Sequence, residues 1–115
     1  MRTMRILALP VIAVLCLQTP IAIAEPVDDA RLKAATGDAS NWLMFGHDYT
    51  NQRFSPQASV SPASIGRLAP RWIHQTGIAG TFQTQPLVAD GMMVITTPHN
   101  HVTALDAATG IEIWR

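Results

Sequence analysis

The chain has 115 residues, enough for about one small domain, and 48% of them are hydrophobic while only 14% are charged. That composition is too apolar for a disordered tail, which would be polar and strongly charged. Eight basic and eight acidic residues give a formal net charge of zero, so nothing indicates electrostatic capture of nucleic acid. The sequence contains neither a G-x-G-x-x-G run nor a P-loop, so a nicotinamide or ATP site has no support.

Residues 1–24 have the pattern of an export signal. Two arginines open the segment, residues 6–17 are apolar, and Ala22-Ile23-Ala24 is the small-x-small pattern that signal peptidase accepts. We expect cleavage before Glu25 and a periplasmic mature protein. The alternative is a retained membrane anchor, since residues 6–24 are nearly long enough to span a bilayer, but the Ala-x-Ala site argues against it.

The single cysteine, Cys16, lies inside this signal. A lipoprotein signal requires a small residue before the cysteine, and Leu15 stands there instead, so we reject a lipid anchor. The mature part would contain no cysteine, and its stability would depend on packing without any disulfide.

The mature chain begins with two segments that differ in character. Residues 25–39 are polar and rich in alanine, and they predict a short, weak helix around Leu32 that ends at Gly37. Residues 40–67 are dense in turn-forming residues, which predicts an ordered, loop-rich segment rather than a flexible linker, because large apolar anchors interrupt the turns. These anchors are Trp42, Met44, Phe45, Tyr49, Phe54 and Ile65.

After Pro70 the pattern becomes that of β-structure. Asp90-Gly91 suits a tight hairpin, because both positions tolerate a positive φ, and Ala107-Ala108-Thr109-Gly110 provides another turn. Four or five short strands joined in this way predict one antiparallel sheet of a repeated β architecture. The expected strands cover residues 71–76, 85–89, 92–97, 101–106 and 111–115.

Residues 104–114 contain a spaced motif, A-x-D-x-x-T-G-x-x-x-W. Asp106 and Thr109 can accept backbone N–H bonds across the turn, and Gly110 can take a positive φ. The D-x-x-T-G part alone is a common hairpin turn, but the full spacing from Ala104 to Trp114 resembles the tryptophan-docking motif of quinoprotein propellers. There the indole packs against the adjacent sheet, so the motif builds blades and performs no chemistry.

A longer resemblance begins at residues 41–56, which read W-x-x-x-G and then N-x-R-F-S-P. Residues 68–72 continue it with L-x-x-x-W, and residues 82–91 contain a P-L-V-x-D-G hairpin. Together these segments resemble the family of alcohol dehydrogenases that depend on pyrroloquinoline quinone (PQQ). The resemblance implies an all-β fold, with residues 40–115 forming the first, incomplete part of an eight-bladed β-propeller.

The same resemblance implies the chemistry. In this family PQQ lies near the propeller axis, usually with calcium, and a catalytic aspartate takes the proton of an alcohol as hydride passes to the quinone. Electrons then leave to cytochrome c or a similar acceptor. The catalytic aspartate and the calcium ligands lie further along such chains, so we expect no catalytic or metal-binding residue here. The expected function is periplasmic oxidation of an alcohol or aldehyde.

One cofactor-pocket position is expected in this chain. Methanol-dehydrogenase-like members have a glutamate before the P-L-V hairpin that lines the PQQ site, and alignment on Pro86 places Gln83 there. A neutral amide can donate to the carboxylates of PQQ without first taking up a proton. The alternative is that Gln83 only satisfies a turn. The exchange also weakens an assignment of methanol as the substrate.

Two histidine patterns suggest other sites. His99 and His101 could share one face of a strand and bind a metal, although no acidic or cysteine partner is near in sequence and a turn is the simpler interpretation. His47 beside Asp48 could be a base and its orienting carboxylate, but no serine or cysteine nucleophile stands in a recognisable elbow.

Two alternatives to an active dehydrogenase stay open. A non-catalytic propeller scaffold shares the docking motif, but such scaffolds are usually lipoproteins and lack the segment found at residues 41–56. An inactive truncated remnant is the other, because a lone blade leaves its faces uncovered and its edge strands unpaired. We therefore expect that this chain needs the missing propeller blades, and that alone it neither closes a propeller nor oxidises an alcohol.

Overall fold

The computed structural model describes residues 25–115, so the predicted export signal lies outside the described residues. One helix, α1, spans Asp29–Ala34, and the strands are β1 (Leu87–Ala89), β2 (Met92–Thr97), β3 (His101–Asp106) and β4 (Glu112–Trp114). Short 3₁₀ turns occupy Ala35–Gly37, Ile65–Arg67 and Pro98–Asn100. In this part of the chain no helix is long and apolar enough to cross a membrane.

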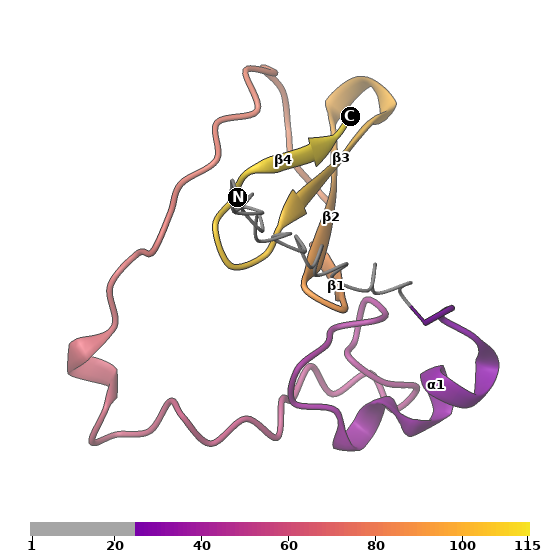
Figure 1. Ribbon diagram of the computed structural model, residues 1–115, viewed down its shortest axis with the longest axis vertical. Coiled ribbons are helices and arrows are strands. Elements are labelled where there is room, and N and C mark those ends of the chain that lie inside the picture. Colours follow the sequence, from indigo (N-terminus) through magenta and orange to yellow (C-terminus); the bar gives the residue numbers. More distant parts are fainter. Residues whose placement is uncertain (1–24) are drawn as a thin grey trace, which may run out of the picture.

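The four strands form one antiparallel sheet in the order β1-β2-β3-β4, as Figure 1 shows. Asp90 and Gly91 both have a positive φ, of 50° and 80°, and they join β1 to β2 as the tight turn that was predicted. β2 and β3 have the predicted bounds, whereas β1 and β4 are shorter than expected. Each short strand is joined to the next by local turns, which is why the sequence pattern indicated the sheet.

The predicted strand at residues 71–76 is wrong, because these residues have no strand partner and form extended coil. Their side chains instead contact the turn after β3. Arg71 Nε donates to the carbonyl of Ala108 at 3.1 Å, and Trp72 Nε1 donates to the carbonyl of Ala107 at 3.1 Å. Residues 71–76 therefore form an extended connection that is anchored to the sheet by side-chain contacts.

The predicted short helix is confirmed as α1. Asp28 caps its N-terminus, since its carboxylate accepts from the backbone N–H of Arg31 at 2.8 Å. With only six residues the helix is too short to be stable in isolation, so its position depends on contacts with the rest of the chain.

Apolar burial is concentrated in a few side chains. Among the described residues, Leu105 in β3 is the largest fully buried apolar residue, with 1% of its surface exposed, and Ala104 beside it is also fully buried. Many large apolar side chains remain exposed, both on β4 and on the extended segment that runs from the N-terminal loops to β1 (Figure 1). They include Phe54, Val60, Ile65, Leu68, Ile73, Ile113 and Trp114. The described residues thus form a sheet with little core of its own.

Candidate functional site

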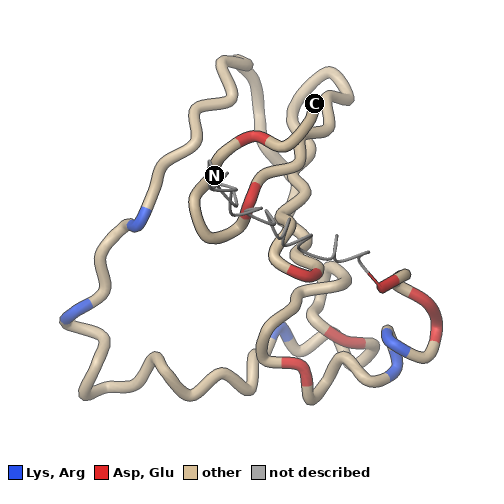
Figure 2. Tube along the Cα trace, viewed as in Figure 1, with Lys and Arg blue, Asp and Glu red and all other residues tan. Residues whose placement is uncertain are grey.

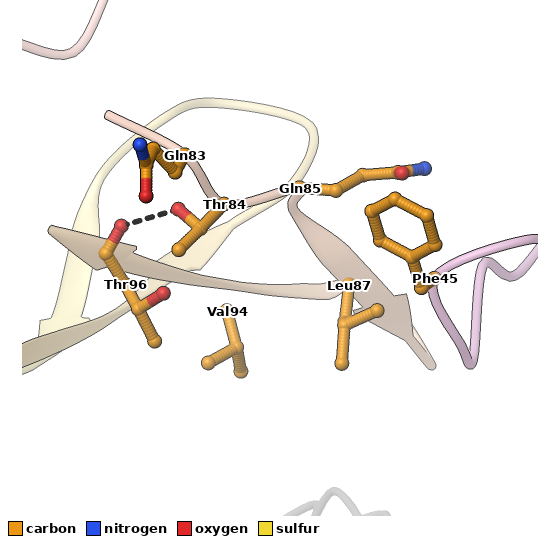
Figure 3. Close-up of a pocket in the computed structure, with 7 residues that line it drawn as sticks. All are labelled: Phe45, Gln83, Thr84, Gln85, Leu87, Val94 and Thr96. Atoms are coloured by element: carbon orange, nitrogen blue, oxygen red, sulfur yellow. Dashed lines mark hydrogen bonds between the residues drawn. The ribbon is translucent and has the colours of Figure 1, made fainter. Parts of the chain in front are cut away.

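A pocket of about 350 Å³ lies against the β1–β2 hairpin (Figure 3). Its floor comes from Leu87 of β1 and Val94 of β2, which face each other across the sheet, together with Thr96 two residues further along β2. The residues before β1 form one wall, and Phe45 of the N-terminal loops forms another. The complete lining is Phe45, Gln83, Thr84, Gln85, Leu87, Val94 and Thr96.

The wall before β1 is fixed by one short hydrogen bond. The hydroxyl of Thr84 donates to the backbone carbonyl of Thr96 at 2.6 Å, as the dashed line in Figure 3 shows. This bond holds both flanking glutamines at the pocket. The Gln83 side chain is exposed at this wall, and no hydrogen bond joins it to another residue within 25–115.

The turn after β3 is organised by Asp106. Its Oδ1 accepts from the backbone N–H of Thr109 at 2.8 Å, from the Thr109 hydroxyl at 2.7 Å and from the N–H of Ala108 at 3.1 Å. The Thr109 hydroxyl, followed by the backbone N–H groups, holds the pKa of Asp106 below its ordinary value. Gly110 closes the turn with a φ of 73°.

An indole does pack on this turn, but it comes from Trp72. A Cβ added at Gly110 would lie 2.5 Å from the ring atoms Cδ2 and Cε3 of Trp72, so only glycine allows the ring to approach this closely. Trp114, the last residue of the motif, is 46% exposed. Sequence analysis singled out Trp72 within L-x-x-x-W but placed it in a strand, and so missed this contact.

The two histidine patterns found in the sequence both have structural explanations. His47 is 1% exposed, its Nε2 lies 3.1 Å from the carbonyl oxygen of Asp38, and its ring packs edge-on against Trp42. Asp48 accepts from the backbone N–H of Thr50 at 2.8 Å and from its hydroxyl at 2.5 Å. The Asp48 carboxylate therefore stabilises its own loop, and no bond from it orients the imidazole of His47.

His99 lies in a 3₁₀ turn with a φ of 66°, while His101 begins β3, so the turn preferred from the sequence is confirmed and the two imidazoles do not share one strand. In the described range, no group of three or more His, Cys, Asp and Glu side chains is placed to hold a metal ion. A second pocket of about 350 Å³ on the same hairpin is lined by apolar residues, whereas the pocket in Figure 3 also has polar side chains, Gln83 among them, so we take that pocket as the candidate binding site.

Residues 42–115 match the family described as PQQ: glucose/ethanol/alcohol dehydrogenase, β-propeller domain. The chain belongs to this family. Its sheet is part of a β-propeller: the solved structure of quinohemoprotein alcohol dehydrogenase ADHIIG from Pseudomonas putida HK5 superposes with a TM-score of 0.73 at 38% identity. That superposition covers 76% of this chain and 13% of the solved chain.

Relatives of known activity agree with this assignment. The chain is 37% identical over 93 residues to quinohemoprotein alcohol dehydrogenase ADH-IIG of Pseudomonas putida, covering 81% of this chain and 13% of the relative. It is 32% identical over 73 residues to a 1-butanol dehydrogenase (cytochrome c) of Thauera butanivorans, covering 64% of this chain and 11% of that relative. The chain thus spans a little over a tenth of the length of these relatives. This part contains the pocket and the turn after β3 at residues 106–110, which we call the docking turn.

Proposed function

We propose that this chain forms the first sheet of a periplasmic, PQQ-dependent dehydrogenase that oxidises an alcohol or aldehyde. The observation that carries this proposal is the pocket itself. Its lining combines the exposed side chain of Gln83 with apolar side chains of β1 and β2, in a sheet that belongs to the PQQ propeller family. An apolar pocket with a few convergent donors is the usual form of a cofactor site.

The donor set fits one side of PQQ. The amides of Gln83 and Gln85 can donate to carboxylate oxygens, and the apolar side chains of Leu87, Val94 and Phe45 can contact a flat ring system. When bound, PQQ would supply the acceptor for hydride from the alcohol. The residues of this chain would bind and orient it, and we assign them no proton transfer. The described residues offer no matching ligand set for calcium, so no calcium-dependent step is assigned to them.

The electron acceptor and the cellular location belong to the same proposal. A relative named as a cytochrome c-linked butanol dehydrogenase supports a cytochrome partner. The signal-like pattern of residues 1–24 supports export, and the mature protein would begin at Glu25. Mass spectrometry of the periplasmic fraction should find Glu25 as the first residue; an N-terminus at Met1 would contradict cleavage.

Sequencing the gene beyond the codon for Arg115 is the first test of the whole proposal. We expect the frame to continue through further docking motifs, a catalytic aspartate and calcium ligands. A stop codon directly after Arg115 would favour the truncated remnant, and a continuation without these residues would favour the non-catalytic scaffold.

The role of Gln83 is tested by titrating PQQ into the apoprotein expressed from its complete gene. Gln83→Ala should weaken PQQ binding roughly 10- to 150-fold, because a hydrogen bond to a charged group contributes roughly 1.5–3 kcal/mol. Gln57→Ala is the matched control, since Gln57 is an exposed glutamine away from the pocket. Equal affinities for these two variants would refute a cofactor contact by Gln83.

The substitution Gln83→Glu tests why an amide suits this position. A carboxylate would repel the carboxylates of PQQ, so the variant should bind PQQ more weakly as the pH rises through the pKa of the new side chain. The wild-type amide does not titrate, and its affinity should lack this pH dependence. Superimposable pH profiles of the two proteins would argue that residue 83 lies away from the charged groups of the cofactor.

A further inference from the structure

The N-terminal arm, residues 25–48, is tied to the β1–β2 hairpin by side chains distant in sequence. The guanidinium of Arg31 reaches the carboxylate of Asp90 with both terminal nitrogens: NH1 donates to Oδ2 at 2.9 Å, and NH2 donates to Oδ1. Arg31 also donates to the backbone carbonyl of Glu25 at 2.9 Å. One side chain thus joins the start of the arm, α1 and the hairpin turn, which lie together in Figure 1.

A second connection runs through Asn41. Its Oδ1 accepts from the backbone N–H of Asp90 at 2.8 Å, and its Nδ2 donates to Asp38 Oδ2 at 2.7 Å. This amide holds the pKa of Asp38 below its ordinary value, as the Arg31 guanidinium does for Asp90. Asn41 therefore bridges a carboxylate of the arm and the backbone of the hairpin turn.

The third connection is made by backbone. Trp42 and Val88 exchange two hydrogen bonds, from Trp42 N to Val88 O at 2.8 Å and from Val88 N to Trp42 O at 2.9 Å. The arm thereby pairs with the outer edge of β1 for one bridge only. A single bridge is a weak attachment, since isolated strand pairs are marginal in water, so the side-chain contacts of Arg31 and Asn41 support it.

The arm supplies one wall of the candidate pocket. Phe45 follows Trp42 by three residues and lies beside Gln85 and Leu87 (Figure 3). Leu43, which follows Trp42 in the chain, is 9% exposed and anchors the arm. The Phe45 ring also contacts the guanidinium of Arg53, whose Cζ lies 4.6 Å from the ring centroid. The position of the pocket wall therefore depends on how the arm lies against β1.

We propose that Arg31, Asn41 and Asp90 are positioning residues that clamp the arm on the hairpin and so hold Phe45 at the wall of the pocket. The clamp itself stands independently of any ligand. Its effect on PQQ rests on the proposed function of the pocket.

The geometry of Arg31 distinguishes it from the neighbouring ion pair. The side chains of Arg31 and Asp90 are 20% and 34% exposed, while those of Lys33 and Asp29 are 69% and 71% exposed. A two-pronged guanidinium contact fixes orientation, whereas an exposed lysine pair on one helix contributes little. Acidic residues outnumber basic ones around the arm and the hairpin (Figure 2). Loss of Arg31 would remove a positive charge that offsets the repulsion between these carboxylates. Lys33 is therefore a matched control.

The clamp is tested by hydrogen exchange in the protein expressed from its complete gene. Arg31→Ala and Asp90→Asn should accelerate exchange of the Trp42 and Val88 amides several-fold, because each removes the ion pair that supports their bridge. Asparagine is chosen at position 90 because it tolerates the positive φ found there. Lys33→Ala should leave these amides unchanged. Exchange rates that are the same in Arg31→Ala and Lys33→Ala would overturn the clamp.

The positioning role is tested by PQQ affinity in a double-mutant cycle. If Arg31 acts through Phe45, Arg31→Ala should weaken PQQ binding several-fold in the wild-type background and have no further effect beside Phe45→Ala. Arg31→Lys, which keeps the charge and loses the second prong, should restore binding only in part. Additive effects of Arg31→Ala and Phe45→Ala would overturn the positioning role.

The two proposals fail in different ways. If exchange accelerates as expected but neither Gln83→Ala nor Phe45→Ala alters PQQ binding, the pocket is no cofactor site and the positioning role falls with it, while the clamp stands. If Gln83→Ala weakens binding but Arg31→Ala does not, the pocket function holds and the positioning role is refuted.

Discussion

Replacing Gly110 by alanine should measure how closely Trp72 is held on the docking turn. Two separate costs are expected. The φ of 73° at Gly110 lies in the left-handed region, and the new Cβ would come within 2.5 Å of Trp72 ring atoms. Gly91 in the β1–β2 turn provides the comparison, since its φ of 80° is similar but a Cβ there would meet nothing within 4 Å.

The magnitudes follow from these two environments. A non-glycine residue in the left-handed region costs about 1–2 kcal/mol, and this should be the whole cost of Gly91→Ala. Gly110→Ala should cost about 1–3 kcal/mol more, because the rigid indole must move to make room. Trp72 cannot shift freely, since its Nε1 also donates to the carbonyl of Ala107 at 3.1 Å.

Hydrogen exchange followed by mass spectrometry reads this difference locally. The Gly110 N–H donates to the Asp106 carbonyl at 2.8 Å, and this amide reports opening of the turn. The extra cost predicts exchange roughly 5- to 140-fold faster than the left-handed penalty alone would give. In a Trp72→Ala background the extra cost should disappear. If Gly110→Ala costs the same with and without Trp72, the close contact does not constrain the turn.

Two further predictions concern the sheet. Leu105→Ala should lower the free energy of unfolding by about 2–5 kcal/mol, because the Leu105 side chain is only 1% exposed. The volume-conserving Leu105→Met should cost less than about 1.5 kcal/mol, and chemical denaturation checks both values. The pKa of Asp106 is held below its ordinary value of 3.8, so its contribution to the docking turn should be full above that pH and be lost as the pH falls through the lower, folded-state pKa. Exchange of the Thr109 amide, corrected for intrinsic rates, should show this acid transition in the wild type and not in Asp106→Asn.

The sequence by itself determined the features that depend on neighbouring residues. The Asp90-Gly91 turn and the D-x-x-T-G turn specify hairpins because their special φ values are satisfied locally, and β2 and β3 between them take the predicted bounds. The spacing of the docking motif and the W-x-x-x-G segment also indicated the propeller family, which the comparisons confirm. Alignment of the family pattern on Pro86 predicted Gln83 as a pocket residue, and Gln83 does line a pocket, although its role in binding a cofactor stays a prediction.

Tertiary structure decided the features whose partners are far apart in the chain. Residues 71–76 look like a strand in sequence, but a strand needs a backbone neighbour, and here the Trp72 side chain finds a turn 35 residues away. Arg31 and Asp90 are separated by 59 residues, so no local pattern pairs them or brings the arm to the pocket. The physical reason is the same in both cases. Local backbone preferences are set by adjacent residues, whereas side-chain contacts between distant segments depend on how the whole chain packs.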